Sequence, residues 1–329
     1  MRSARATVRA MRWAIVGAGA IGSFVGARLR LAGEEVVLLA RGAHADALRS
    51  RGLMLLDLDR ERQVDVGVET DPAIVGAVDV LVLALKAHQL RDALPAIAAL
   101  CGPATTVVSM QNGIPWWYPL GHPIAEGWEL TSVDPGGVLA RAIPVERTLA
   151  ASLYLAATVV APGVVRHTHG ERIVLGAVAP AGAGRMKPVA AALGRAGFRV
   201  DATDAPRREI WAKLLGNAAF NPVSALSRAT MGQIQAQPRA MRLVRGVMLE
   251  CLAVAAVLGD APAIDPDARI AQSPQDDTKT SMLQDLEAGR PLEIDALLGA
   301  VVELGERSGS AVPLCSAVYG LVTLLNRGG

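Results

Sequence analysis

A glycine-rich loop near the beginning of the chain, Gly17-Ala18-Gly19-Ala20-Ile21-Gly22, limits the possible folds more than any other segment. The loop follows an apolar, strand-like segment at residues 13–16 and precedes a helix-like segment at residues 20–32. In that setting the glycines let the backbone approach a pyrophosphate, whose charge is attracted by the N-terminus of the helix. The motif alone is weak evidence for a dinucleotide site in a chain with 33 glycines, so the prediction depends on the flanking strand and helix. We predict a dinucleotide site at Gly17, Gly19, Ala20, Ile21 and Gly22; the alternative is a tight turn that binds nothing.

The end of the second predicted strand, residues 35–40, indicates which dinucleotide is bound. Enzymes that use NAD place an acidic residue about 20 residues after the loop, against the ribose hydroxyls. This chain has Ala40-Arg41 there. A guanidinium can pair with the 2′-phosphate of NADP, whereas a carboxylate would repel it. We therefore predict NADP(H) as the cofactor, with a solvated arginine at the strand end as the alternative.

Strand-like and helix-like segments alternate through the first half of the chain. Such alternation predicts a parallel sheet with helices on both faces, and two long segments separated by Pro162-Gly163 predict a hairpin. The further strands are expected at residues 78–85, 105–109, 149–161, 164–175 and 198–201, and the further helices at residues 89–100 and 185–196.

From residue 206 onward the strand signal disappears, and apolar residues recur three and four positions apart. The fold class is therefore α/β, a Rossmann-type parallel-sheet domain followed by an all-helical C-terminal domain. We expect a loose N-terminal extension at 1–11, an NADP-binding Rossmann-type domain at 12–205 and a helical substrate and dimerisation domain at 206–329. The helical segments are expected at residues 210–218, 240–258, 280–288, 294–307 and 312–325, with a long loop at 259–278.

Composition and charge exclude several classes of protein. A net charge of +2 from 33 basic and 31 acidic residues gives no field of one sign, so no nucleic-acid surface is expected. Residues 93–125 lack charged side chains, but Pro and Gly interrupt them every few residues, and a spanning helix needs roughly 20 uninterrupted apolar residues. The first twelve residues are arginine-rich without an apolar segment, so they do not form a secretory signal. No membrane association is predicted, and the partner is expected to be a small molecule.

The three cysteines, Cys101, Cys251 and Cys315, are odd in number and lie far apart in the sequence. They predict neither a disulfide framework nor a metal site, and they favour a reducing cytoplasm. The five histidines form no helical ligand pair, so no metal is expected.

The scarcity of lysine points to candidate functional residues. Only four of the 33 basic residues are lysine, and only four residues are asparagine. Arginine cannot deprotonate, whereas a buried lysine can, so a lysine hints at a titratable ammonium. Lys213, Asn217 and Asn221 are spaced i, i+4 and i+8 in one apolar helical segment. They predict a polar stripe that faces a ligand cleft; the alternatives are a solvent-facing helix face, and a capping role for Asn221 before Pro222.

Two further polar residues follow predicted strands. Lys86 ends the strand at 78–85, and Asn112-Gly113 follows the strand at 105–109. Both are expected at the carboxyl edge of the sheet, where open α/β sheets bind ligands. A simple turn is the alternative for Asn112-Gly113.

Over nearly its whole length the chain resembles the ketopantoate reductase (2-dehydropantoate 2-reductase) family. The landmarks that carry the resemblance occur in one order along the sequence. They are Gly17 to Gly22, Ala40-Arg41, Leu85-Lys86-Ala87, Gln111-Asn112-Gly113, residues 211–222, residues 281–285 and Glu293-Ile294-Asp295.

The resemblance implies that NADPH delivers hydride to the ketone carbon of a 2-oxo acid. It implies Lys213 as the general acid and Glu293 as the residue that orients Lys213 and holds the substrate hydroxyl. It implies Ser281 at the substrate carboxylate, and Asn217 and Asn221 as hydrogen-bond partners of the substrate. It also implies that Asn112 links cofactor and substrate, and that Arg41 and Lys86 recognise the NADP phosphate or ribose.

The sequence departs from the family pattern at several positions. Met231 and Thr278 stand where asparagines are common, and Leu292 replaces a common threonine. The aromatic segment Trp116-Trp117-Tyr118 and an insertion at 126–147 differ from the compact enzymes. We expect the aromatic segment either to line a larger apolar pocket or to cover the sheet edge.

Two other functions remain open at this point. A 3-hydroxy acid dehydrogenase also joins a glycine-loop domain to a helical domain with a catalytic lysine, but the pattern of Asn217, Asn221, Ser281 and Glu293 argues against it. A non-catalytic NADP-binding sensor would need neither Lys213 nor Glu293. The sequence does not indicate which 2-oxo acid is the substrate, which face receives the hydride, or how many subunits assemble.

Overall fold

The structure is a computed structural model, and it describes residues 9–58 and 60–326. Most of the predicted N-terminal extension, residues 1–11, therefore lies outside the described residues. Within its last part, the backbone N–H of Met11 donates to the carboxylate of Glu34 at 2.8 Å.

The chain forms two compact units. We name them the sheet unit (Met1–Leu85, Asp92–Met110 and Ile143–Asp204) and the helical unit (Lys86–Arg91, Gln111–Ala142 and Ala205–Gly329). The predicted division at 205/206 differs from this by two segments, 86–91 and 111–142, which join the helical unit. The longer of the two carries large side chains, including Trp116 and Trp117, that are buried there.

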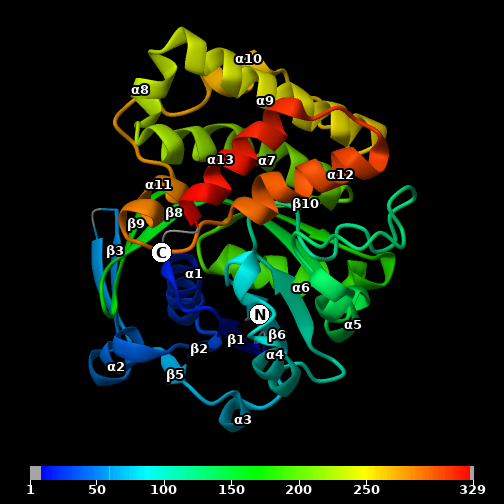
Figure 1. The fold of residues 1–329 in the computed structure, drawn as a ribbon. Helices are drawn as coiled ribbons and strands as arrows, with labels where there is room; N and C mark the ends of the chain where they lie inside the picture. Colours follow the sequence, from blue (N-terminus) through cyan, green and yellow to red (C-terminus); the bar gives the residue numbers. More distant parts are fainter. Residues whose placement is uncertain (1–8, 59, 327–329) are drawn as a thin grey trace, which may run out of the picture. The chain divides into compact units, whose positions relative to one another are not determined.

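One edge of the sheet has the predicted Rossmann arrangement (Figure 1). Six strands run parallel in the order β5-β2-β1-β6-β7-β8. The strands are β1 (Arg12–Val16), β2 (Glu35–Leu39), β5 (Gly67–Glu69), β6 (Val80–Leu83), β7 (Thr106–Ser109) and β8 (Thr148–Ala161). The helices of this unit are α1 (Ala20–Leu31), α2 (Gly42–Arg51), α3 (Pro72–Val75), α4 (Leu94–Leu100) and α6 (Ala183–Arg195).

The other part of the sheet is mixed, where the sequence suggested a parallel sheet. Strand β9 (Val164–Ala177) pairs antiparallel with β8, as the predicted hairpin requires. The other edge of β9 pairs with β3 (Leu53–Asp57) along its first part and with β10 (Arg199–Thr203) along its second. Strand β4 (Arg60–Val64) completes an antiparallel pair with β3. The Rossmann-type sheet domain followed by helices is confirmed.

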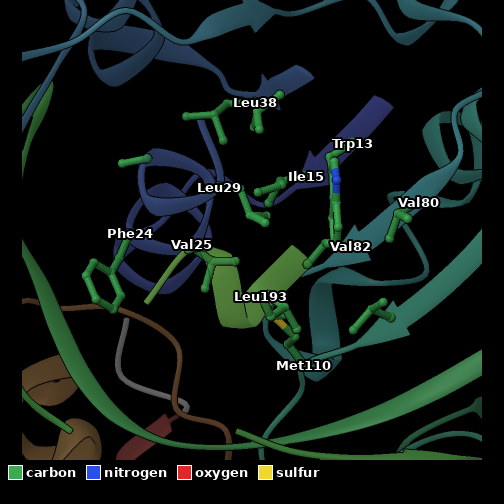
Figure 2. Packing of buried hydrophobic residues seen from close by; sticks show 14 of the residues in the cluster. Trp13, Ile15, Phe24, Val25, Leu29, Leu38, Val80, Val82, Met110 and Leu193 are labelled. Carbon is green, nitrogen blue, oxygen red and sulfur yellow. The ribbon is translucent and has the colours of Figure 1, made fainter. Parts of the chain in front are cut away.

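The core of the sheet unit lies between α1 and the strands. Figure 2 shows Val25 and Leu29 of α1 near Ile15 of the sheet, while Phe24 of the same helix points away from them, and its ring stacks on that of His167. These side chains are fully or almost fully buried, which stabilises the contact between strand and helix by removing apolar surface from water. The packing fixes the end of β1 relative to the start of α1, where the glycine loop lies.

The helical unit is built around the long helix α7 (Pro206–Ser227). The helix continues through Pro222, although proline lacks the N–H that would bond to the carbonyl of residue 218. It ends at Ser227, and the next residue, Arg228, has a φ of 56° in the left-handed region. Asn221 therefore lies inside the helix, and the alternative that it caps the helix end is wrong.

The remaining helices largely follow the predicted segments. The long loop expected at 259–278 contains a short helix, α10, that Asp265 caps by accepting from the N–H of Ala268 at 2.8 Å. The segment expected at 294–307 starts as a π-helical turn, Asp295–Gly299, before α12. The helices are α5 (Val138–Ala142), α8 (Met231–Gln235), α9 (Pro238–Val257), α10 (Pro266–Ala271), α11 (Ser281–Glu287), α12 (Ala300–Ser308) and α13 (Pro313–Asn326). Across residues 9–58 and 60–326, we find no helix with the length and apolarity needed to cross a membrane.

Candidate active site

The glycine loop connects β1 to α1 in a turn that only glycine fits. Gly17 has a φ of 103°, and a Cβ there would lie 2.8 Å from the backbone of Ala84 and Leu85. A Cβ on Gly22 would overlap the carbonyl oxygen of Gly17. Both glycines are therefore required for the close approach of β1, α1 and the end of β6.

The N-terminus of α1 can receive an anion. Gly19 precedes the helix, no side chain caps it, and its first turn carries no acidic residue. A Cβ on Gly19 would meet no described atom within 4 Å, so the space above the loop is open. The backbone N–H groups of Ala20 and Ile21 lack partners within the helix because they are in its first turn. These features suit the pyrophosphate of a dinucleotide.

Arg41 lies where the sequence placed it, directly after β2. It precedes α2, its side chain is exposed, and it has no hydrogen bond or ion pair with the described residues. No acidic side chain occupies the end of β2, which reads Leu39-Ala40-Arg41. The guanidinium is free to bind an anion.

In the helical unit, α7 presents Lys213, Asn217 and Asn221 along one face. The ammonium of Lys213 donates to Oδ1 of Asn112 at 2.7 Å, although the two residues are 101 positions apart. Burial lowers the pKa of Lys213 to about 8, while the negative charges of Glu293 and Glu209 act in the opposite direction. Lys213 is therefore mostly protonated at neutral pH, as a proton donor must be, and its pKa lies close to that pH.

Glu293 is close enough to Lys213 to influence its charge. Burial raises the pKa of Glu293, and the positive charge of Lys86, a hydrogen bond from Ala87 and the charge of Lys213 oppose that effect. Its Oε1 accepts from the backbone N–H of Ala87 at 3.3 Å. The two groups form an electrostatic pair in which each favours the charged form of the other.

Lys86 has a partner that the sequence did not reveal. Its ammonium binds Oδ2 of Asp285 at 2.6 Å and the carbonyl oxygen of Pro291 at 3.2 Å. The other oxygen of Asp285 binds Nε of Arg290 at 2.9 Å. Asp285 belongs to the landmark at 281–285, which was the only signal that pointed to it. In this structure Lys86 thus pairs with a carboxylate of its own unit.

Several of the predicted residues line one small cavity of the helical unit. Ser281 is the first residue of α11, and Thr280 caps that helix by accepting from the N–H of Leu283 at 3.2 Å. Asn217 is half-buried on α7 but is not among the lining residues. The cavity is lined by Asn112, Asn221, Ser281, Met282, Asp285, Glu293 and Leu297.

The aromatic segment does not line this cavity. Trp116, Trp117 and Tyr118 are at most 3% exposed and belong to the helical unit. Neither this cavity nor the second cavity of the helical unit, described below, has any of the three among its lining residues. The hydroxyl of Tyr118 accepts from Nε1 of Trp211 at 2.9 Å, which ties the segment to α7.

The insertion at 126–147 is attached to α12. The carboxylate of Glu303 accepts hydrogen bonds from the backbone N–H groups and hydroxyls of Thr131 and Ser132, at 2.7 to 3.1 Å. Part of the insertion, including Val133 and Leu139, lines a second cavity of about 650 Å³ that also contains Leu292 and Glu293.

Two family models match the chain. The model described as ketopantoate reductase PanE/ApbA covers residues 13–180, and the model of its C-terminal part covers residues 206–326. A 2-dehydropantoate 2-reductase of Mesorhizobium japonicum is 43% identical over 319 residues, which is 96% of this chain and 98% of that protein.

Solved structures agree with the family models. The crystal structure of a putative ketopantoate reductase from Ralstonia solanacearum has a TM-score of 0.91 and 41% identity, covering 97% of this chain and 98% of that one. A D-mandelate dehydrogenase bound to NADH and anilino(oxo)acetate has a TM-score of 0.83 and 25% identity, covering 96% and 99%. With both family models and these relatives matching nearly the whole length, the chain belongs to the ketopantoate reductase family.

Proposed function

We propose that this protein uses NADPH to reduce the ketone of a 2-oxo acid to a hydroxyl group, with 2-dehydropantoate as the first candidate substrate. The observation that carries the proposal is the ammonium of Lys213, held by Asn112 at 2.7 Å and with a pKa lowered to about 8. A proton donor is most effective when its pKa lies near the working pH.

Lys213 acts as the general acid. NADPH, when bound, supplies a hydride to the ketone carbon. Lys213 hydrogen-bonds the ketone oxygen and transfers a proton to it, so the C=O bond becomes a C–OH group and Lys213 is left neutral. Solvent then returns the proton. Positioned acid catalysis of this kind contributes roughly 10²- to 10⁴-fold in rate.

The neighbouring side chains hold the substrate. Glu293 keeps Lys213 charged before the transfer and accepts a hydrogen bond from the substrate hydroxyl. Ser281 binds the substrate carboxylate, and the amides of Asn217 and Asn221 bind its other polar groups. The shared cavity of Asn221, Ser281 and Glu293 supports these roles.

The cofactor contacts follow from the glycine loop. We assign the pyrophosphate to Gly17, Gly19, Ala20, Ile21 and Gly22, because a Cβ would block the turn while the space above it is open. Arg41 binds the 2′-phosphate, since its guanidinium is exposed and has no partner among residues 9–58 and 60–326.

Asn112 and Lys86 are assigned as further cofactor contacts. Asn112 would link cofactor and substrate through the amide nitrogen, because its oxygen is already used by Lys213. A cofactor contact by Lys86 requires that Asp285 share the ammonium, which has three N–H donors and uses two of them here.

The proposal is tested by following NADPH absorbance with 2-dehydropantoate, 2-oxoisovalerate and bulkier aromatic 2-oxo acids. The aromatic acids are included because the similar D-mandelate dehydrogenase was crystallised with anilino(oxo)acetate. Turnover of at least one 2-oxo acid is expected. Tight NADPH binding without turnover across the panel would favour a sensor, and oxidation of 3-hydroxyisobutyrate-like compounds would favour a 3-hydroxy acid dehydrogenase.

We also propose that the protein is cytoplasmic and forms a homodimer through the helical unit. The three free cysteines, two of them buried, are consistent with a reducing compartment. On α13, Leu321 and Leu324 are 54% and 64% exposed, an apolar surface that a second copy could cover. Light scattering on the purified protein distinguishes a dimer from a monomer.

A further inference from the structure

One loop of the helical unit, residues 112–120, is hydrogen-bonded to helix α7 at several positions. The loop begins at Asn112, which accepts from Lys213. Six residues later, the carbonyl oxygen of Tyr118 accepts from Nε of Arg207 at 2.8 Å, and the hydroxyl of the same residue accepts from Nε1 of Trp211 at 2.9 Å. Arg207 also donates to the carbonyl oxygen of Leu120. Residues at three positions of α7 thus bind one short segment.

The hydroxyl of Tyr118 is itself fixed. It donates to Oδ2 of Asp260 at 2.7 Å, and Nε2 of His122 donates to the same oxygen at 3.1 Å. His122 can donate from Nε2 because its Nδ1 accepts from the N–H groups of Ile124 and Ala125, both at 3.0 Å. The hydroxyl of Tyr118 therefore donates to Asp260 and accepts from Trp211, and Asp260 is itself held by His122.

The surroundings of Tyr118 leave it little freedom to move. The side chain is 0% exposed, and its ring meets the Trp211 ring edge-on with centroids 6.2 Å apart. Burial and the charge of Asp260 raise the pKa of Tyr118 above its usual range, so its hydroxyl remains a donor. A buried hydroxyl with both partners in place rigidifies its neighbourhood.

Trp211 and Lys213 lie on opposite sides of α7. Residues that are two positions apart in an α-helix, as Trp211 and Lys213 are, are separated by about 200° of rotation around the helix axis. Trp211 faces inward and is 0% exposed, while Lys213 reaches Asn112 on the other side. The contact at Trp211 and Tyr118 therefore fixes the loop and helix against each other, and with them the distance between Asn112 and Lys213.

We propose that Tyr118 is a positioning residue, which holds the loop that carries Asn112 so that Asn112 and Lys213 meet in the geometry needed for proton transfer. The inference rests on the proposed function of Lys213. Tyr118 acts through Asn112 and has no assigned contact with substrate or cofactor.

A double-mutant cycle tests this role. Tyr118→Phe removes only the hydroxyl, and it should lower kcat roughly 10- to 100-fold, the size expected when a reacting group is misplaced by about 1 Å. The same substitution made in an Asn112→Ala protein should change kcat by less than about twofold, because the group through which it acts is gone. The proposal would be overturned if kcat of the double variant fell by the product of the two single losses, or if Tyr118→Phe left kcat unchanged.

A second readout does not depend on turnover. The chain has only four lysines, so ¹³C-labelled lysine gives a simple NMR titration in which Lys213 can be assigned by replacing it with arginine. In Tyr118→Phe the titration of Lys213 should move from about 8 toward the ordinary value, because a loosened loop admits water and burial is the main cause of the low pKa. An unchanged titration contradicts the inference. Absence of turnover by the unmodified protein would refute the proposed function alone.

Two variants serve as controls. Tyr154→Phe is the same hydroxyl deletion in the sheet unit, where the ring packs against Arg172, and it should leave both readouts unchanged. Asp260→Asn keeps an acceptor for Tyr118 but removes the charge, so it should give a smaller effect of the same sign. If Tyr118→Phe does not fold, the same cycle with Asp260→Asn and Asn112→Ala decides the question: non-additive effects support the proposal, and additive effects refute it.

Discussion

The low pKa of Lys213 makes a specific prediction for the pH dependence of the reaction. The ordinary lysine value is 10.5, and here it is lowered to about 8. At about 1.36 kcal/mol per pH unit, this difference corresponds to roughly 3 kcal/mol against the charged form. The main cause is burial, so the ammonium is held in the site at a free-energy cost and releases its proton readily.

Reduction requires the protonated form of Lys213, and oxidation of the product requires the neutral form. We therefore expect kcat/KM for reduction to be constant below a pH of about 8 and to fall about tenfold per pH unit above it. In the reverse direction the rate should rise with pH through the same value and then become constant. Initial rates in both directions, measured at constant ionic strength from pH 6 to 10, would show the two profiles.

Lys213→Arg is the matched variant for this experiment. Arginine keeps the positive charge but does not release its proton at these pH values. We expect kcat to fall ~10²- to 10⁴-fold, and we expect the decrease of kcat/KM above a pH of about 8 to disappear from the reduction profile. A reduction profile that stays constant up to pH 10, or a Lys213→Arg protein with normal kcat, would refute the assignment of Lys213 as the acid.

Three further predictions concern stability and cofactor binding. Lys213→Met should raise the free energy of unfolding at pH 7 by ~1–3 kcal/mol, because the buried charge is removed, and the gain should shrink as the pH rises from 8 to 10.5; urea unfolding at several pH values checks this. Arg41→Ala should weaken NADPH binding roughly 10- to 100-fold and leave NADH binding unchanged, as calorimetry with both dinucleotides would show; equal losses would contradict a 2′-phosphate contact. Gly22→Ala should abolish binding of both dinucleotides in the same experiment, because its Cβ would overlap the carbonyl oxygen of Gly17.

The parts of the fold that depend on local sequence were predictable. Strand β1, the glycine loop and α1 form one continuous local pattern, and their residues were identified within one or two positions. Strand β4 was missed because Arg60, Glu61, Arg62 and Gln63 lie exposed at the edge of the sheet, so no apolar pattern marks it. Its place depends on pairing with β3 rather than on its own composition.

The candidate site could be predicted in its residues but only partly in its contacts. The scarcity of lysine and the helical spacing identified Lys213 and Asn221 without reference to any relative. The pairing of Lys86 with Asp285 joins residues 199 positions apart, and the burial of Tyr118 against Trp211 joins residues 93 apart. Such contacts arise from the tertiary fold, and no short pattern in the sequence encodes them.

The role of Lys213 as the proton donor is best tested by the single-turnover oxidation of NADPH by 2-dehydropantoate, followed by absorbance in the unmodified protein and in Lys213→Ala. We expect stoichiometric oxidation by the unmodified protein and a rate ~10²- to 10⁴-fold lower in the variant, with NADPH binding intact. Equal rates in the two proteins would contradict the claim that Lys213 supplies the proton. No oxidation by the unmodified protein with this or any other 2-oxo acid would contradict the proposed reaction itself.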